Sequence, residues 1–263
     1  MFGKKWKAMM AAGVLAAAMV MTGCGGSSNA GSASGSGSAQ IIRVGAETTY
    51  PPFEFTKDDK YVGFDIDLSE AIIKQMGGQM EFKSMGFDAL IPALQSGQID
   101  MAASGMDVTP EREKQVSFSD VYFDQSGKVI IVSKDNDQIH DWNDLSGKVV
   151  GGQVGTTQVQ LAQEAGASQV KQFDSNSQAF MELKAKTVDA VVIDAPIGMY
   201  YLKQGGDKDM KIVGTPKGNA GFAIAMKKDN KELQEKVNKA LKEIKANGTY
   251  DKIYEKWFGS SSK

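Results

Sequence analysis

Short apolar runs alternate with segments of helical periodicity through most of the chain. The runs predict strands at Ile41 to Gly45, Met80 to Met85, Ile99 to Ala103, Lys148 to Gly151, Gln169 to Phe173, Val188 to Ile193 and Met210 to Val213. The segments between them predict helices at Asp65 to Met76, Phe87 to Gln95, Thr157 to Ala165, Ser177 to Lys184 and Pro196 to Lys203. Strands that alternate with helices favour parallel sheets covered on both faces. Because the order of elements repeats, we expect two similar α/β lobes.

Capping residues indicate where several helices begin and end. Asp65 is expected to cap the first helix, and Gly77 to end it. The C-terminal stretch from Glu232 to Phe258 carries apolar residues spaced for one buried face, at Leu233, Val237, Leu241 and Ile244. A first helix is expected to end at Asn247-Gly248, and Thr249 is expected to cap a second.

The N-terminal residues have the pattern of a secretion signal. Three lysines, at positions 4, 5 and 7, precede an apolar stretch from Ala8 to Met21. This stretch is shorter than the roughly 20 residues that a membrane-spanning helix needs. We therefore expect residues 1–23 to be a signal peptide and the remainder to be extracytoplasmic.

The signal ends at the only cysteine of the chain. Met21-Thr22-Gly23-Cys24 resembles a bacterial lipobox, in which the cysteine is lipidated, although a leucine is usual where Met21 stands. The alternative is an ordinary cleavage site with an incidental cysteine. Residues 24–40 are rich in Gly, Ser and Ala and are expected to form a flexible tether. The protein is thus predicted to be a lipoprotein, held at the cell membrane by lipid on Cys24.

Composition excludes several classes of function. The formal net charge of −2 becomes −5 when the three leader lysines are removed, and no basic stripe is present, so nucleic acid is not an expected partner. With one cysteine and one histidine, neither a metal cluster nor a Cys/His nucleophile pair can be assembled. We therefore expect no metal and no cofactor. His140, in a polar stretch, is expected in a surface loop.

Ligand recognition is expected just after the strands. In open α/β sheets, ligands bind beyond the carboxyl ends of the strands, where loops and helix N-termini meet. The corresponding segments are Glu47 to Phe53, Phe87-Asp88, Ser104 to Arg112, Gln153 to Gln158 and Asp194 to Pro196.

Several motifs in these segments resemble those of one family. Four runs of residues are similar to those of the family 3 extracellular solute-binding proteins, the polar amino-acid receptors of ABC importers. They are Tyr-Pro-Pro-Phe-Glu-Phe, Val-Gly-Phe-Asp-Ile-Asp-Leu, Thr-Pro-Glu-Arg and the ending Asn-Gly-Thr-Tyr-Asp-Lys-Ile-Tyr-Glu-Lys-Trp-Phe. The resemblance covers Ile41 to Gly259. It implies a non-enzymatic receptor, expected to be a monomer, that captures a free amino acid and delivers it to an ABC permease in the membrane.

The family's fold is the type II periplasmic-binding-protein-like α/β fold, with two lobes, two crossing strands and a cleft between the lobes. The resemblance implies a first lobe of residues 41–125 plus 221–263 and a second lobe of residues 126–220. The crossings are expected near residues 124–128 and 219–222.

A buried amino acid needs a partner for its carboxylate and for its ammonium. Arg112 is the candidate for the carboxylate because guanidinium offers a bidentate fork, and it is one of only two arginines among the 30 basic residues. The alternative is a surface ion pair with Glu111 or Glu113. The family pattern adds donors from the backbone at Ser104 to Asp107, including Gly105, and from Thr157, which begins a predicted helix. Gln158, the next residue, is also predicted to bind the ligand.

Five positions match side-chain contacts of the family with the ligand. Asp194 matches the acceptor for the ligand ammonium, although it could also cap the helix that follows it. Glu47 and Asp107 match positions that face the ligand side chain, and members with neutral ligands tend to carry serine or threonine at the Asp107 position. Tyr50 and Phe87 match two rings that sandwich the ligand, with core packing as the alternative.

The balance of these charges predicts the ligand. Two carboxylates directed at one pocket repel each other unless a cation lies between them. A cationic amino acid supplies that cation, with arginine first and lysine, ornithine or histidine as further candidates. The alternatives are a receptor for glutamine or another polar neutral amino acid, a dehydratase-like enzyme and a sensor subunit.

Overall fold

The computed structural model describes residues 39–124, 127–218 and 221–259. The predicted signal peptide, the lipidation site Cys24 and nearly all of the predicted tether lie outside the described residues. The centres of both predicted crossings, residues 125–126 and 219–220, lie outside them as well. No helix in the described part of the chain is long and apolar enough to cross a membrane.

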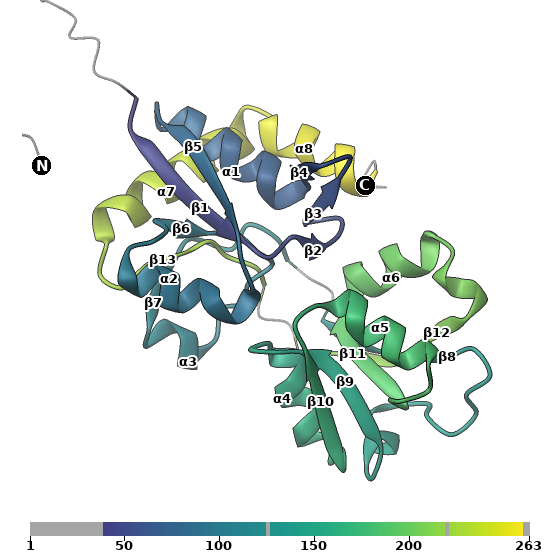
Figure 1. Cartoon of the computed structure of the whole chain (residues 1–263). Coiled ribbons are helices and arrows are strands. Elements are labelled where there is room, and N and C mark those ends of the chain that lie inside the picture. The colour runs from purple at the N-terminus through teal and green to yellow at the C-terminus, as the bar shows by residue number, and fades with distance from the viewer. Residues whose placement is uncertain (1–38, 125–126, 219–220, 260–263) are drawn as a thin grey trace, which may run out of the picture. The chain divides into compact units, whose positions relative to one another are not determined.

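A first five-stranded sheet is built from both ends of the folded chain (Figure 1). Its strands are β1 (Ile41–Ala46), β5 (Gln79–Ser84), β6 (Met101–Ala102), β7 (Val116–Phe118) and β13 (Ala225–Lys227). Their order is β5-β1-β6-β13-β7. β1 runs parallel to β5 and β6, whereas β13 is antiparallel to β6 and β7.

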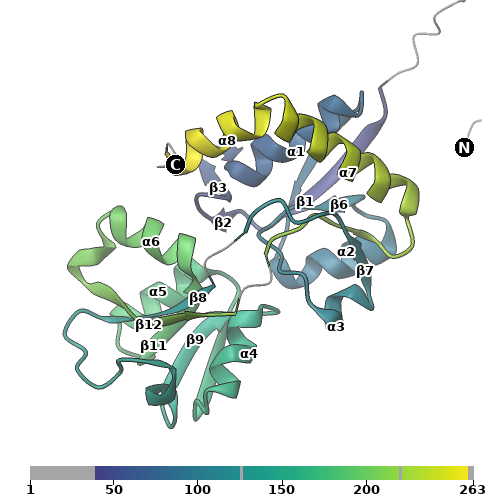
Figure 2. The same cartoon turned by 180° about the vertical axis from the view of Figure 1, so that it is seen from behind.

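Helices cover both faces of this sheet, as Figures 1 and 2 show from opposite sides. One face packs on α1 (Phe64–Gln75), α7 (Lys231–Ala246) and α8 (Thr249–Phe258). The other face packs on the 3-10 turn η1 (Phe87–Ala89) and on α2 (Leu90–Ser96). Neighbouring strand residues divide between the two layers, since Met101 belongs to the first cluster and Ala102 to the second.

A second five-stranded sheet lies within residues 128–217. Its strands are β8 (Lys128–Ser133), β9 (Val149–Gln153), β10 (Gln169–Phe173), β11 (Ala190–Asp194) and β12 (Met210–Lys217), in the order β10-β9-β11-β8-β12. α5 (Asn176–Lys184) and α6 (Ala195–Lys203) pack on one face. α4 (Thr157–Glu164) and the 3-10 turn η2 (Trp142–Leu145) pack on the other.

The smaller elements complete the chain. A three-stranded antiparallel sheet consists of β2 (Thr49–Tyr50), β3 (Glu54–Lys57) and β4 (Lys60–Val62). α3 (Pro110–Glu113) precedes β7, and the 3-10 turn η3 (Gly206–Lys208) precedes β12. The only histidine, His140, is exposed in a loop, as expected.

The predicted α/β fold with two lobes is confirmed, but the predicted purely parallel sheets are wrong. Each sheet is mixed, because β13 in the first and β8 in the second run antiparallel to their neighbours. These strands were not expected from the alternation of strands and helices, since each follows an irregular segment instead of a helix. The strands of the first sheet lie before residue 125 and after residue 220, and those of the second sheet lie between residues 127 and 218. The lobe boundaries stay a prediction.

Two predicted caps are wrong. Asp65 lies inside α1, where it is fully buried, and Gly63 is the N-cap residue instead. Gly63 has φ +143, and a Cβ there would lie 1.9 Å from the Phe53 carbonyl oxygen, which explains why a glycine stands at this position. Thr249 is the first residue of α8, and its N-cap is Gly248. In both helices the backbone geometry is set by a glycine and not by a capping side chain.

An aromatic cluster holds the first lobe together around Phe53. This side chain is fully buried, and its ring centroid lies 4.8 Å from that of Phe123, 5.2 Å from Phe222 and 5.3 Å from Phe258. Phe123 and Phe222 also form an isolated bridge beside the two crossings. The cluster therefore joins the segment around Phe53 to the C-terminal helix α8 and to the segments beside both crossings.

Replacing Phe53 with alanine is expected to lower the free energy of unfolding by about 3–5 kcal/mol, because it leaves a cavity within this cluster. Urea unfolding followed by circular dichroism would measure the loss. Met181→Ala is a suitable control, since Met181 is 60% exposed and should change stability by less than about 0.5 kcal/mol. A similar small loss for both variants would contradict the role given to Phe53.

Candidate ligand-binding site

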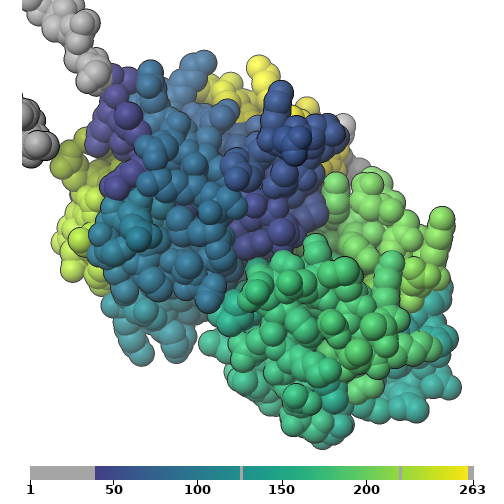
Figure 3. All heavy atoms as spheres, in the orientation of Figure 1, coloured from purple at the N-terminus to yellow at the C-terminus, as the bar shows by residue number. Residues whose placement is uncertain are grey.

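Loops that follow strands of both sheets meet at one pocket. The pocket spans about 290 Å³ of space not filled by atoms, including space open to solvent. In the space-filling view of Figure 3, atoms of the two lobes are in contact. The residues that line the pocket are Glu47, Tyr50, Glu54, Phe87, Ser104, Gly105, Asp107, Arg112, Gln153, Thr156, Thr157, Gln158 and Asp194. All ten residues predicted from the sequence are therefore brought together, along with Glu54, Gln153 and Thr156, which were not predicted.

The sheet topology explains why these residues converge. β1 ends at Ala46, directly before Glu47, and β6 ends two residues before Ser104. In the second sheet, β9 leads into the N-terminus of α4 at Thr157, and β11 ends at Asp194. β1 and β6 are parallel to each other, as are β9 and β11, so each pair ends at one edge of its sheet.

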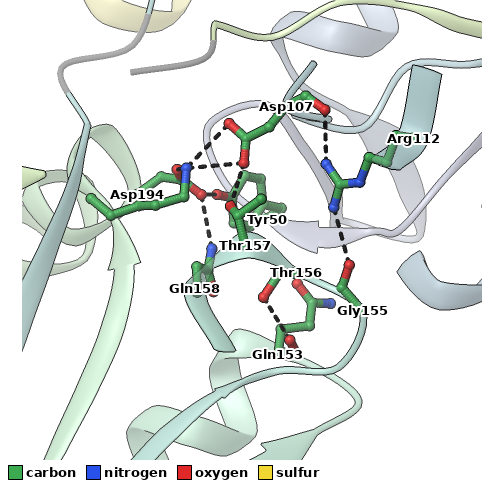
Figure 4. Close-up of polar contacts among 10 residues, drawn as sticks. Tyr50, Asp107, Arg112, Gln153, Gly155, Thr156, Thr157, Gln158 and Asp194 are labelled. Atoms are coloured by element: carbon green, nitrogen blue, oxygen red, sulfur yellow. Dashed lines mark hydrogen bonds and ion pairs between the residues drawn. The ribbon is translucent and has the colours of Figure 1, made fainter. Parts of the chain in front are cut away.

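Arg112 reaches the pocket from α3. Pro110 begins this short helix, and the hydroxyl of Thr109 caps it by accepting a hydrogen bond from the Arg112 N–H. The guanidinium donates from Nη1 to the Asp107 carbonyl at 2.9 Å and from Nη2 to the Gly155 carbonyl at 3.0 Å (Figure 4). It also lies over the Phe87 ring, with Cζ 5.2 Å from the ring centroid.

These contacts differ from a surface ion pair with Glu111 or Glu113. Arg112 is 7% exposed, and burial lowers the pKa of its guanidinium, against the opposing effect of Asp107 and Asp194. A guanidinium carries five N–H groups, of which two serve the carbonyls named above. The side chain thus places a positive charge and further donors at the pocket wall.

Asp107 and Asp194 share a lysine that was not predicted from the sequence. The ammonium of Lys128 lies 2.9 Å from Asp107 Oδ2 and 2.9 Å from Asp194 Oδ1. Lys128 begins β8 and stands directly opposite Asp194 in the antiparallel pair of β8 and β11. Burial lowers the pKa of Lys128, but the two carboxylates outweigh this effect and hold it above its ordinary value. The charge balance drawn from the sequence left this lysine out and is corrected accordingly.

The remaining contacts of Asp194 and Asp107 are polar side chains from both lobes. Asp194 Oδ2 accepts hydrogen bonds from the Tyr50 hydroxyl and from Gln158 Nε2, as Figure 4 shows. Although Asp194 occupies the N-cap position of α6, its side chain does not cap the helix. Asp107 Oδ2 accepts from the Thr157 hydroxyl. Burial and the nearby Asp194 raise the pKa of Asp107, and Lys128 opposes them.

Glu47 presents a buried oxygen to the pocket. Thr49 donates to its Oε1 at 2.7 Å, and the Glu47 N–H donates to Ser104 Oγ. Its Oε2 has no donor within 3.5 Å among the described residues, although the Gln153 side chain is near enough to lower the pKa of Glu47, and Oε1 of Gln158 also has no donor among them. Burial raises the pKa of Glu47. Since buried acceptors are nearly always paired in proteins, both oxygens point to a ligand that carries N–H groups.

Two buried acids, Glu54 in the pocket lining and Asp65 beside the lining residue Gly105, hold the loop that follows β6. Glu54 and Asp65 are both fully buried. Ser104 Oγ donates to Glu54 Oε1 at 2.8 Å, and the Gly105 N–H donates to Asp65 Oδ2 at 2.8 Å. The Gly105 N–H was expected to serve a ligand carboxylate, and it is directed to Asp65 instead. Burial raises the pKa of Glu54 well above its usual value and that of Asp65 to about 6.

The residues missed by the sequence analysis had weak signals. Glu54 is an acid between two phenylalanines, and Lys128 precedes the apolar run Val129 to Val132. Either could have been read as an exposed strand residue. Gln153 and Thr156 lie in a segment that was identified, and they were passed over in favour of their neighbours. The described residues contain no group of three or more His, Cys, Asp or Glu side chains arranged to hold a metal ion.

Glu54 is expected to make stability depend on pH. Above the ordinary pKa of a glutamate, the unfolded chain has released this proton while the folded protein keeps it, so the free energy of unfolding falls as the pH rises. Glu54→Gln keeps the size of the side chain and removes the titratable proton. As the pH rises above about 5.5, the variant should lose stability less steeply than the parent, by up to about 1.4 kcal/mol per pH unit.

Urea unfolding at several pH values would measure this slope for both proteins. Glu70→Gln is the matched control, since Glu70 is exposed on α1 and its replacement should leave the slope unchanged. Equal slopes in the parent and in Glu54→Gln would show that Glu54 is ionised in the folded protein.

Comparison with known proteins shows the family of this chain. The model of the bacterial extracellular solute-binding proteins, family 3, matches residues 42–260. The arginine-binding extracellular protein ArtP of Bacillus subtilis (strain 168) is 40% identical over 259 residues, which cover 97% of this chain and 98% of that protein. A solved structure of an ancestral arginine-binding protein bound to arginine is 53% identical, with a TM-score of 0.79, and the match covers 83% of this chain and 98% of that one.

A second solved structure shows an ancestral arginine-binding protein bound to glutamine. It is 52% identical, with a TM-score of 0.80, and the match covers 84% of this chain and 98% of the other. All three relatives are binding proteins. The chain belongs to the bacterial extracellular solute-binding proteins of family 3.

Proposed function

We propose that this protein is the substrate-binding lipoprotein of an amino-acid ABC importer and that it captures a cationic amino acid, arginine before lysine, ornithine or histidine. The observation that carries the cationic ligand is the buried Oε2 of Glu47, which has no donor among the described residues. A guanidinium or ammonium on the ligand side chain would donate to it and neutralise its charge.

A count of charges at the pocket supports this ligand class. Arg112 and Lys128 contribute two positive charges, and Glu47, Asp107 and Asp194 contribute three negative ones. Glu54 is left out of the count because burial and the neighbouring Asp65 raise its pKa well above its usual value, which favours the protonated form. A zwitterionic ligand with a neutral side chain leaves one negative charge uncompensated in the pocket, whereas a cationic ligand balances it.

The remaining contacts suit the common part of an amino acid. The Arg112 fork and the first N–H groups of α4, which begins at Thr157, would receive the ligand carboxylate. Asp194 would accept from the ligand ammonium, and the rings of Tyr50 and Phe87 line the same pocket. The backbone of Ser104 and the side chain of Gln158 would complete the set of polar contacts.

The relatives support the same proposal at a coarser level. One carries arginine in its name and another was solved with arginine bound, and both match most of this chain. The structure solved with glutamine favours a second candidate, a receptor for glutamine. We extend the proposal to the cell surface, with lipid on Cys24 as the anchor, an ABC permease as the partner and a monomer as the active form.

Titration calorimetry with arginine, lysine, ornithine, histidine, glutamine and glutamate would test the proposal. We expect arginine to bind most tightly, with the other cationic amino acids ahead of glutamine. Tighter binding of glutamine than of arginine would overturn the cationic assignment in favour of the second candidate. No heat of binding from any free amino acid would overturn the receptor function itself.

Arg112→Ala should weaken arginine and glutamine alike, by more than about 100-fold, because both ligands carry the carboxylate that this side chain receives. Calorimetry on the folded variant would measure the loss. Arg43→Ala is the matched control: the other arginine of the chain pairs with Asp100 at 2.7 Å and is not part of the pocket lining. Its loss should leave both affinities unchanged. A loss for only one ligand would contradict the proposed contact.

A further inference from the structure

Lys128 is a buried, charged residue immediately behind the pocket. It is 3% exposed, and its ammonium contacts Asp107 Oδ1 at 3.1 Å, Asp107 Oδ2 at 2.9 Å and Asp194 Oδ1 at 2.9 Å. Both aspartates line the pocket, whereas Lys128 is not among the lining residues. The lysine therefore acts on a ligand through the two carboxylates and not by direct contact.

The three side chains form one electrostatic unit, the Asp107–Lys128–Asp194 cluster. Two carboxylates this close to one another repel, and a buried ammonium without partners is costly, so the arrangement is stable only as a whole. It carries one net negative charge, where the two aspartates alone would carry two. That single charge is what an amino-acid ammonium requires, and every amino acid offers such an ammonium.

The net charge of the cluster affects how strongly the pocket prefers a cationic amino acid to a neutral one. If the cluster can compensate only the ligand ammonium, a cationic side chain gains its extra stabilisation from Glu47, which follows β1 and has a buried Oε2. Asp107, held by Lys128 and by the Thr157 hydroxyl, contributes less than a free carboxylate would. The preference for a cation is thus limited by the lysine behind the pocket.

We infer that Lys128 is a specificity-determining residue, which neutralises one pocket carboxylate and so sets how strongly the site prefers a cationic amino acid to a neutral one. This inference rests on the proposed function, because it concerns the ligand of the same site. Its alternative is a purely structural ion pair that joins β8 to β11 and to the Asp107 loop, and that leaves selectivity unaffected.

The test measures the ratio of the glutamine and arginine dissociation constants by calorimetry at about pH 8. Lys128→Met removes the positive charge, so the ratio should rise in favour of arginine by about tenfold or more. Asp107→Asn removes a negative charge and should lower the ratio by a similar factor. The double variant restores the original net charge and should return the ratio to within about threefold of the parent value.

Two controls separate charge from structure. Lys186→Met changes the net charge of the protein equally, but its side chain is 70% exposed and pairs with Asp135, so the ratio should not move. Lys128→Arg keeps the charge and should keep the ratio close to that of the parent. If Lys128→Met does not fold, Asp107→Asn and the double variant still decide the matter, since neither leaves the two aspartates facing each other without a cation.

A readout without ligand distinguishes this inference from the proposed function. The pKa of Asp107 in the ligand-free protein, measured by carboxyl NMR, should be higher in Lys128→Met than in the parent, because the ammonium lowers it. A parent protein that binds no amino acid would refute the proposed function while this measurement still tests the cluster. Unchanged ratios in both single variants of a parent that binds both ligands would refute the inference alone.

Discussion

Charge compensation in a buried pocket is the constraint on which this structure depends. Arg112, Asp107, Asp194, Lys128 and Glu47 are each less than a tenth exposed, and the desolvation of any one of them would be unfavourable without partners. The contacts supply those partners from both lobes, since the Asp107 carboxylate of the first lobe meets Lys128 and Thr157 of the second. These polar contacts therefore join the two lobes at the pocket.

Hydrophobic packing within each lobe, more than the charges themselves, sets the positions of these charged side chains. The parallel strands β1 and β6 end at one edge of the first sheet, and β9 and β11 end at one edge of the second. Apolar clusters on both faces of each sheet hold the strands in register. A functional group that follows a strand is thus carried to the pocket by hydrophobic packing, so the loops can vary in chemistry while the sheets retain their geometry.

Two buried acids hold the loop after β6 in place at the pocket. Glu54 and Asp65 receive hydrogen bonds from Ser104 and Gly105, the residues that follow β6. Burial places both acids where they fix this loop, and it also raises their pKa values. The Tyr122 hydroxyl donates to Asp65 as well, which ties the loop to the segment before the first crossing. The loop that follows β6 and lines the pocket is in this way held in place by two buried acids.

The sequence by itself determined the α/β class, most of the helices and the segments after the strands in which the pocket residues lie, because hydrophobic periodicity and post-strand position are local properties. Most of the individual residues in those segments were predicted from the resemblance to a family. It also singled out Arg112, since a rare arginine in a lysine-rich chain stands out without any structure. Only the tertiary structure decided the direction of β8 and β13, the burial of Asp65 and Glu54, and the place of Lys128 between two aspartates far away in the chain. These depend on which strands become neighbours, and a lysine at the start of a strand reads the same in the sequence whether it faces water or two buried carboxylates.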